Sequence, residues 1–540
     1  MAFRHGEHVM SSGAVSLPSG RRSAINLWFV AAVVVIPTLI GSVDTTIVGV
    51  ARPYIAGGLS VPADDDEWVM TSYLASIAFI FPITGWLSAH FGRRDYFLFS
   101  IAVFTIASAL CGMAASFPQL ILFRVIQGVA AGGFQPSSQA ILLDSFPLKK
   151  QGAAQTLFVI AILVGPIVGP ILGGWLVVNY SWRWIFYINA PAGLVSFLAC
   201  YALLEDPDYL RHERAELKKR PLKFDGIGLG LLALVIASWE VMLTKGQEWD
   251  WLGDPFWRVQ TLLIVFVLAM AGLLCRGLTF VSPVGNFRVL RDRNFAASCG
   301  ITFGAFAVLY AASVALPQLL LTSFGYNAYV AGLVLWPAGV FSALTLLVVG
   351  RLLGLGIEAR WLIASGLLIM AAGNYWMALM NLNISPSQAI WPRVATIIGL
   401  SLMVAPLNVA AFRYIPKHLC GAAVGFLALL RNEGASFGTS MAQTIQERRE
   451  QFHLSRLNEN LSQLNPRVHS FMERGQEFFM RLAGDPAHSH LRSVNVLDNL
   501  RQQQAASFAF FDVFWVAAVA SLVLVSLVFL MKRPVAGTNP

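Results

Sequence analysis

Residues 165–174 read GPIVGPILGG in the middle of a long apolar run. The glycines at positions 165, 169 and 173 are four residues apart, so in an α-helix they share one face and let a neighbouring backbone approach closely. The prolines at 166 and 170 weaken the hydrogen-bond ladder of that helix. The string therefore predicts a tightly packed helix that bends or shifts at this point. An ordinary tight helix crossing is the alternative explanation.

This apolar run is one of fourteen along the chain. The 540 residues are 56% apolar and only 12% charged, whereas soluble proteins carry about 25% charged residues. A helix needs roughly 20 apolar residues to cross a bilayer. We therefore expect an all-α polytopic membrane protein, surrounded by membrane lipid, with spans near 27–50, 67–89, 96–115, 118–142, 153–178, 184–204, 226–243, 258–280, 295–322, 329–350, 361–380, 390–412, 420–442 and 509–531.

Lysine and arginine indicate the topology, because short cytoplasmic loops carry the excess of positive charge. With the N-terminus inside, 23 of these residues fall on the cytoplasmic side and 5 at the short outer loops. Both termini are therefore expected in the cytoplasm. Arg124 and Arg431 fall inside spans, where topology does not explain them. The net charge of +9 is spread between apolar runs, so we expect no nucleic-acid partner.

The domain organisation follows from the same runs. A densely charged stretch closes the first six spans, and a long polar segment precedes the last one. We expect an N-terminal tail (1–26), a six-helix bundle (27–204), a charged linker (205–225), two additional helices (226–280), five helices of a second bundle (281–442), an extracytoplasmic helical segment (443–508), the last span (509–531) and a C-terminal tail (532–540).

Several strings resemble signatures of the major facilitator superfamily. The string with Gly165, Pro166, Gly169, Pro170, Gly173 and Gly174 resembles its antiporter motif, and DTTIVGVARP at 44–53 resembles the first-span signature of fourteen-span drug:proton antiporters. RVIQGVAAG at 124–132, with Gln127 and Gly128, resembles the fourth-span motif, and GWLSAHFGRR at 85–94 resembles the loop between spans two and three. Three further strings match the same family: SWRWIFYINAP at 181–191, LPQLLLTSFGY at 316–326 and LLRNEGASFGTS at 429–440. Together they look like the EmrB/QacA type, closest to EmrB-type permeases of Gram-negative bacteria.

The resemblance implies a fold and an activity. The fold is the major facilitator fold, two six-helix bundles plus two extra helices, which rock about a central cavity. The activity is export of a lipophilic small-molecule substrate, weakly acidic or uncharged, across the inner membrane in exchange for protons. We expect no enzyme activity and no cofactor, with the proton gradient as energy source. The chain has no P-loop GxxxxGK[ST], and its five single cysteines form no CxxC metal pair.

The cytoplasmic loop at 85–94 departs from the family pattern at two positions. The family usually carries an acidic and then a basic residue where this chain has Ala89 and His90. The charged residues of the family's usual latch are therefore missing at these two positions. Gly85, Gly92, Arg93 and Arg94 still fit a tight gating turn. A positive-inside anchor explains the two arginines as well.

Asp44 and Arg124 are expected at matching depth in the outer half of the membrane. Asp44 lies eight residues before Arg52 and Arg124 seven after Phe117, or about 10–12 Å deep at about 1.5 Å per residue. Each buried charge costs about 2.5–3.5 kcal/mol on insertion, so the two need a partner or a water-filled cavity. A structural ion pair is one explanation. Proton coupling is the other, and the resemblance assigns the fourth-span arginine to proton transfer.

The predicted thirteenth span carries a second charged set. Arg431 and Glu433 are two residues apart, so they point to different faces of a helix and need other partners. Glu433 is a candidate proton or cation site, with a structural role as the alternative. The small residues Gly434, Gly438 and Ala442 repeat the spacing of GPIVGPILGG, as expected for a paired gating helix in the other half.

The outer segment carries a heptad seam of apolar residues. Leu454, Leu457, Leu461, Leu464, Val468 and Phe471 follow spacings of three and four, broken at Asn465-Pro466. A helical hairpin that packs on its own transporter is one interpretation. The other is docking to a partner, since the resemblance implies a periplasmic adaptor (an EmrA-like membrane fusion protein) and a TolC-like outer-membrane channel.

Three other functions remain as competing hypotheses. A proton-coupled uptake symporter shares the fold, but GPIVGPILGG weighs against it. A non-transporting scaffold or receptor has no evident use for buried Asp44 and Arg124. A membrane-embedded enzyme needs a catalytic or metal-ligand set at a shared depth, and we find none in the sequence.

Overall fold

The computed structural model describes residues 27–62, 65–205, 225–279, 287–326, 328–355, 357–382, 385–416, 419–461, 465–483 and 485–532. The first half consists of α1 (Leu27–Leu59), α2 (Trp68–Phe91), α3 (Arg93–Met113), α4 (Phe117–Ala131), α5 (Phe134–Ser145), α6 (Leu148–Asn179), α7 (Trp184–Tyr187) and α8 (Asn189–Leu203). The predicted N-terminal tail, the linker from 206 to 224 and residues 533–540 lie outside the described ranges.

The remainder of the chain is also helical in its described ranges. It consists of α10 (Gly226–Lys245), η1 (Trp251–Gly253), α11 (Arg258–Thr279), η2 (Phe287–Arg291), α12 (Arg293–Gln318), η3 (Leu319–Ser323), α13 (Ala328–Gly354), α14 (Ala359–Ala378), α15 (Pro386–Phe412), α16 (Cys420–Asn460), α17 (Pro466–Ala483) and α18 (Pro486–Phe529). Each predicted span corresponds to one of these helices or to two in succession. The fourth span is divided into α4 and α5 at Gly132-Gly133, where adjacent glycines weaken a helix.

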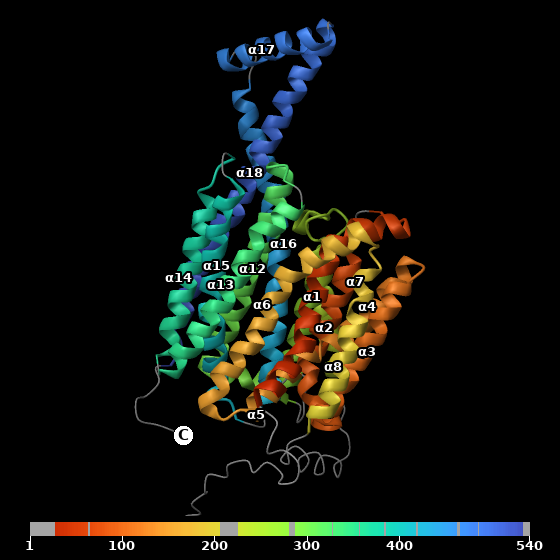
Figure 1. Ribbon diagram of the computed structural model, residues 1–540, viewed down its shortest axis with the longest axis vertical. Helices are drawn as coiled ribbons and strands as arrows, with labels where there is room; N and C mark the ends of the chain where they lie inside the picture. Colours follow the sequence, from red (N-terminus) through yellow and green to blue (C-terminus); the bar gives the residue numbers. More distant parts are fainter. Residues whose placement is uncertain are drawn as a thin grey trace, which may run out of the picture.

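Thirteen of the described helical segments are long and apolar enough to cross a membrane. The predicted thirteenth span is not among them, because Arg431, Asn432 and Glu433 interrupt the apolar first part of α16. This helix nevertheless lies inside the bundle, packed against α2, α12 and α18 (Figure 1). The expected count of fourteen spans therefore depends on α16.

The helices form two groups that lie side by side (Figure 1). In the first group α1 packs along α6, and in the second α12 packs along α16. The additional helices α10 and α11 pack on each other, and α10 also contacts α2 of the first group and α16 of the second. The two added helices are thus attached where the groups meet.

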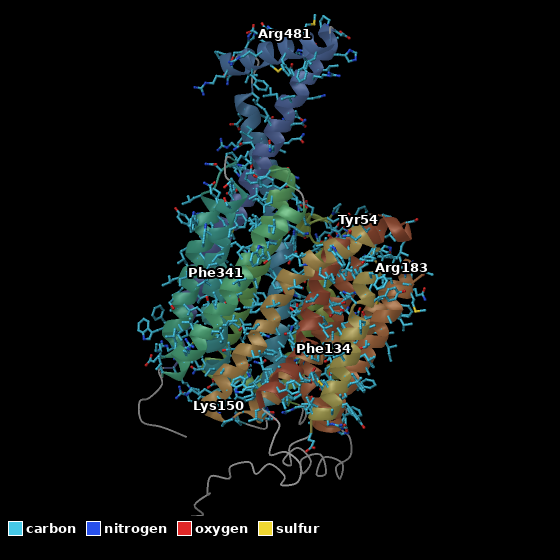
Figure 2. The ribbon with its side chains drawn as sticks, in the orientation of Figure 1. Tyr54, Phe134, Lys150, Arg183, Phe341 and Arg481 are labelled. Atoms are coloured by element: carbon cyan, nitrogen blue, oxygen red, sulfur yellow. The ribbon has the colours of Figure 1, made fainter. Side chains whose placement is uncertain are left out.

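The segment predicted outside the membrane extends from one end of the bundle. Beyond the bundle α16 and α18 continue together, and α17 crosses between their far ends (Figure 1). Arg481 lies at this far end, and Lys150 lies at the opposite edge of the molecule (Figure 2). Two polar contacts tie its base to the loop after α10: Trp251 Nε1 donates to Thr444 Oγ1 (3.1 Å) and Gln247 Nε2 to Glu447 Oε2 (2.9 Å).

Candidate functional site

Asp44 of α1 and Arg124 of α4 form an ion pair inside the first group of helices. Arg124 Nη1 lies 2.7 Å from Asp44 Oδ2, and neither side chain is exposed to solvent. Arg124 Nε also donates to the carbonyl oxygen of Val69 on α2 (3.1 Å). The equal depth expected from the sequence is therefore realised as direct contact.

Two amide side chains complete the surroundings of Asp44. Asp44 Oδ1 accepts from Asn189 Nδ2 of α8 (2.7 Å) and from Gln127 Nε2 of α4 (3.2 Å). Gln127 Oε1 in turn accepts from Arg124 Nη1 (2.9 Å). The Asp44 carboxyl group is thus held by donors from α4 and α8, and such donors offset the cost of burying a charge.

Tyr73 connects the ion pair to a central cavity. The Arg124 guanidinium lies 3.9 Å from the centre of the Tyr73 ring. Tyr73 also lines the cavity, together with Thr38, Gly41, Ser42, Thr45, Ile77, Phe81, Ala131, Phe134, Gln135, Ile162, Phe306, Tyr310, Arg431, Asn432 and Ala435. Figure 2 labels Phe134 near the middle of the bundle. Residues of both groups face this cavity, and most of them are apolar or aromatic.

Arg431 of α16 crosses the cavity between the two groups. Its Nη1 donates to Gln135 Oε1 of α5 (3.3 Å), and its guanidinium lies 5.4 Å from the Phe306 ring. The cavity volume is about 50 Å³, well below the roughly 300–1,000 Å³ of sites for drug-sized ligands. A drug-sized molecule therefore needs the two groups to move apart.

The glycines of GPIVGPILGG pack directly on α1. A Cβ atom at Gly173 would lie 2.9 Å from the carbonyl oxygen of Ile47, and one at Gly169 would lie 3.1 Å from the Ile47 nitrogen. Thr46 Oγ1 donates to the carbonyl oxygen of Gly165 (3.1 Å). Gly174 is different, because its Cβ would meet only Val50, at 3.9 Å. Pro170 is part of α6, whereas the side chain of Pro166 lies outside the described part of the chain.

The second group repeats this contact. Gly434 and Gly438 of α16 pack against the backbone of Phe303 and Ala307 on α12. The two small-residue patterns found in the sequence thus lie at equivalent helix pairs, α1 with α6 and α12 with α16. Tight packing is needed at both.

The two groups of helices also contact each other at the end of the bundle that carries the loop at 85–94, called the motif loop below. A Cβ atom at Gly85 of α2 would lie 2.9 Å from the carbonyl carbon of Gly421 on α16. Gly128 of α4 allows a similarly close contact with α2 inside the first group, since a Cβ atom there would lie 3.2 Å from the Tyr73 Cα. Only small residues fit at these positions.

The arginines of the loop at 85–94 form ion pairs despite Ala89 and His90, and Arg94 Nη1 lies 3.5 Å from Asp95 Oδ1. Arg93 pairs with Asp144 of α5, and its Nη1 also donates to the carbonyl oxygen of Ala140 (3.3 Å). Arg94 Nη2 donates to the carbonyl oxygen of Tyr201 (3.0 Å) on α8. Gly92 has a φ of 93°, which favours glycine at the turn between α2 and α3. His90 stacks on Trp86.

The apolar seam of the outer segment is partly covered by the segment itself. Leu454, Leu457, Leu461, Val468 and Phe471 are all half-buried, and Leu464 lies outside the described residues. More exposed apolar side chains lie farther out, with Phe478 60%, Leu482 67% and Leu491 60% exposed. The self-packing interpretation therefore applies to part of the seam.

Sequence reasoning missed four of these residues. Asn189 lies within the string 181–191 that carried the family resemblance, but its contact with Asp44 spans 145 positions. Asp144 and Gln135 follow the fourth-span motif, and Tyr73 is one aromatic residue among many in an apolar run. Only the packing of separate helices identifies their partners.

Known proteins share both the sequence pattern and the fold. Residues 34–439 match the family described as the Major Facilitator Superfamily. The chain is 33% identical to the Multidrug export protein EmrB of Haemophilus influenzae, covering 92% of this chain and 94% of that protein. It is 31% identical to the Probable multidrug resistance protein EmrY of Escherichia coli (94% and 96% covered) and 30% identical to the Fatty acid resistance protein FarB of Neisseria gonorrhoeae (91% and 93% covered).

Solved structures agree on the fold. The proton:xylose symporter XylE superposes with a TM-score of 0.58 at 13% identity, covering 93% of this chain and 95% of that one. The human organic anion transporter MFSD10 gives a TM-score of 0.56 at 15% identity, covering 94% and 100%. At these identities the likeness concerns the helical architecture alone.

Proposed function

This chain belongs to the major facilitator superfamily, within its EmrB type of multidrug export permease, and from that membership and its buried ion pair we propose how it works. It exports lipophilic drugs or other toxic small molecules in exchange for protons. The observation that carries the coupling is the Asp44–Arg124 pair, which is fully buried and contacts the cavity-lining side chain of Tyr73. No other described carboxylate of α1 to α8 is fully buried against an arginine.

Protonation of Asp44 changes the contacts among three helices. When Asp44 is ionised, it accepts from Arg124 and Gln127 of α4 and from Asn189 of α8. A bound proton neutralises the carboxylate and leaves the buried guanidinium without its counter-charge, which is costly in a low-dielectric interior. The helices relieve this cost by moving, and α1 transmits the movement to α6 through the glycine contacts. Proton binding is thereby linked to the access state.

The cavity suits a lipophilic substrate that is weakly acidic or uncharged. Its walls include Ile77, Phe81, Phe134, Phe306 and Tyr310, and Arg431 is the one charged side chain among the described residues that line it. Apolar and aromatic walls bind varied lipophilic molecules, and a guanidinium attracts a carboxylate or phenolate. One relative is named a fatty acid resistance protein, which supports an acidic lipophile as one substrate class.

The outer segment is the proposed docking site of a periplasmic adaptor. Its position beyond the bundle, its half-buried seam and its exposed apolar tip fit a helical partner that leads on to an outer-membrane channel. This proposal places the protein in the bacterial inner membrane with both termini in the cytoplasm, as the distribution of lysine and arginine indicates.

Transport by the purified protein in liposomes tests the proposed function. A weakly acidic or uncharged lipophilic drug, such as a fluorescent dye, should move against its gradient when a pH gradient is imposed and should stop when an uncoupler is added. Drug transport that is the same with and without the pH gradient and the uncoupler would exclude proton-coupled export.

A further inference from the structure

Two buried carboxyl groups lie on facing helices, one on the added helix α10 and one on α16 of the second bundle. Glu240 of α10 is 2% exposed and Glu433 of α16 is 8% exposed. Ser436 Oγ donates to Glu240 Oε1 (3.1 Å), and one turn farther along α16 Ser440 Oγ donates to the carbonyl oxygen of Leu243 (2.6 Å). Positions 433, 436 and 440 therefore lie on the face of α16 that packs on α10.

Stacked aromatic rings lie beside Glu240 on the same two helices and on α11. Trp239, next to Glu240, stacks on Phe437 of α16 (6.3 Å between ring centres) and on Phe266 of α11 (5.2 Å). Both carboxyl oxygens of Glu433 lack a hydrogen-bond partner among the described residues. Glu240 is the one charged side chain among the described residues that acts on Glu433, together with the polar side chains of Asn432 and Trp239.

No cation among the described residues neutralises the pair. On α16, Arg431 turns to Gln135 and the cavity, and on α10, Lys245 pairs with Glu248. The cations of α11 lie at its ends, where Arg258 pairs with Asp254 and Arg276 with Asp225. On α2, His90 stacks on Trp86 at the helix end, and α12 carries only Arg293, at its first residue.

Two ionised carboxylates are untenable in such surroundings. Adjacent like charges repel, and a buried carboxylate is costly without donors: Glu240 has the Ser436 hydroxyl, whereas no described residue donates to Glu433 at hydrogen-bond distance. One proton held between them removes the repulsion and lets one carboxyl donate to the other. The hydroxyl of Ser436 supplies a further donor to Glu240.

We propose that Glu240 and Glu433 share a proton and form a second proton-binding site of this transporter. The site lies next to the central cavity, because Asn432, the residue before Glu433, lines that cavity. Use of this proton in transport rests on the proposed function, but the existence of the shared proton does not.

The site gives the added helices a role in coupling. Helix α16 contacts α2 near Gly421 and packs on α12 near Gly434, so it must shift when the groups change their contacts. A shift of α16 relative to α10 separates Glu433 from Glu240. Gain or loss of the shared proton is thus linked to the position of α16.

Infrared spectroscopy of the purified full-length protein in lipid tests the shared proton directly. At neutral pH we expect a carbonyl stretching band from a protonated carboxyl group that shifts in D2O. In Glu240→Gln and in Glu433→Gln the band should change position and titrate at a different pH, and in the double variant it should be absent. Glu447→Gln, an exposed position of the same helix, should leave it unchanged. A double variant that retains the wild-type band, or single variants that leave it unmoved, would overturn the proposal.

The ratio of protons to substrate in liposomes tests the use of this site. The double variant should show a lower ratio than wild type while it still binds the drug, and an unchanged ratio would contradict a role in coupling. If wild-type protein fails to transport any drug, the proposed function fails, yet the infrared result still decides whether the proton is shared.

Discussion

The guanidinium of Arg124 lies 2.7 Å from the carboxylate of Asp44, although 80 positions separate the two residues. Both side chains are fully buried. Such a pair is costly unless further hydrogen bonds support it, and here Gln127 and Asn189 supply them. The pair therefore depends on the correct packing of α1, α4 and α8, and any movement of these helices acts on it.

Removal of the Asn189 amide should weaken this assembly. In Asn189→Ala, Asp44 Oδ1 keeps only the bond from Gln127 among those described, and loss of one donor to a buried charge costs about 1–3 kcal/mol. We expect a lower thermal midpoint of the purified protein. Asn179→Ala is the matched control, because Asn179 is exposed and bonds within its own helix. Equal midpoints for both variants would show that Asn189 does not support the pair.

Close packing at Gly169 should be essential for transport. Gly169→Leu places a large side chain against Thr46 and Ile47, so α1 and α6 are forced apart and one access state is favoured. Transport in liposomes should stop, and cysteine-accessibility patterns should match a single state. Gly174→Leu is the control on the same helix, since its Cβ has space. If Gly169→Leu behaves like Gly174→Leu, the argument from close packing is wrong.

The ion pair of Arg93 with Asp144 should contribute to closure at the motif loop. A partly exposed pair contributes up to about 1 kcal/mol, so Arg93→Ala should lower the transport rate about two- to five-fold. Exchange of the charges, Arg93→Asp with Asp144→Arg, should restore much of the rate. A double variant slower than both single variants would argue against a pairwise contact.

The outer segment should bind its partner without taking part in transport. Leu457→Asp with Leu461→Asp should weaken co-purification with a periplasmic adaptor and lower whole-cell drug resistance, while transport in liposomes persists. Phe478→Asp with Leu482→Asp tests the more exposed apolar tip in the same assays. Loss of liposome transport in the seam variant would favour self-packing instead, and unchanged co-purification in both variants would exclude both surfaces as the docking site.

The sequence predicted the helices well, because each span is a long apolar run and lipid leaves few alternatives to a helix. It also identified Asp44, Arg124 and the glycine pattern, since charges and closely spaced glycines stand out in such runs. Partners were harder to predict. Asn189 and Asp144 acquire their roles only when α8 packs on α1 and α5 on α3.

Glu240 shows a different limit. It is a lone carboxylate in the apolar run 226–243, the same signal that identified Asp44, yet the sequence analysis overlooked it. The signal was present, but its partner Glu433 lies on another helix and nearly two hundred positions away. A search for every charged residue within a span would have found it, whereas the pairing itself required the structure.

The most direct test of proton coupling is drug transport by Asp44→Asn in liposomes with an imposed pH gradient, at equal protein content with wild type. Asparagine keeps the size of the side chain but neither carries the charge nor binds the proton. The account predicts that pH-driven transport is abolished while drug binding and insertion persist. Near-normal pH-driven transport in this variant would contradict it and remove Asp44 from the mechanism.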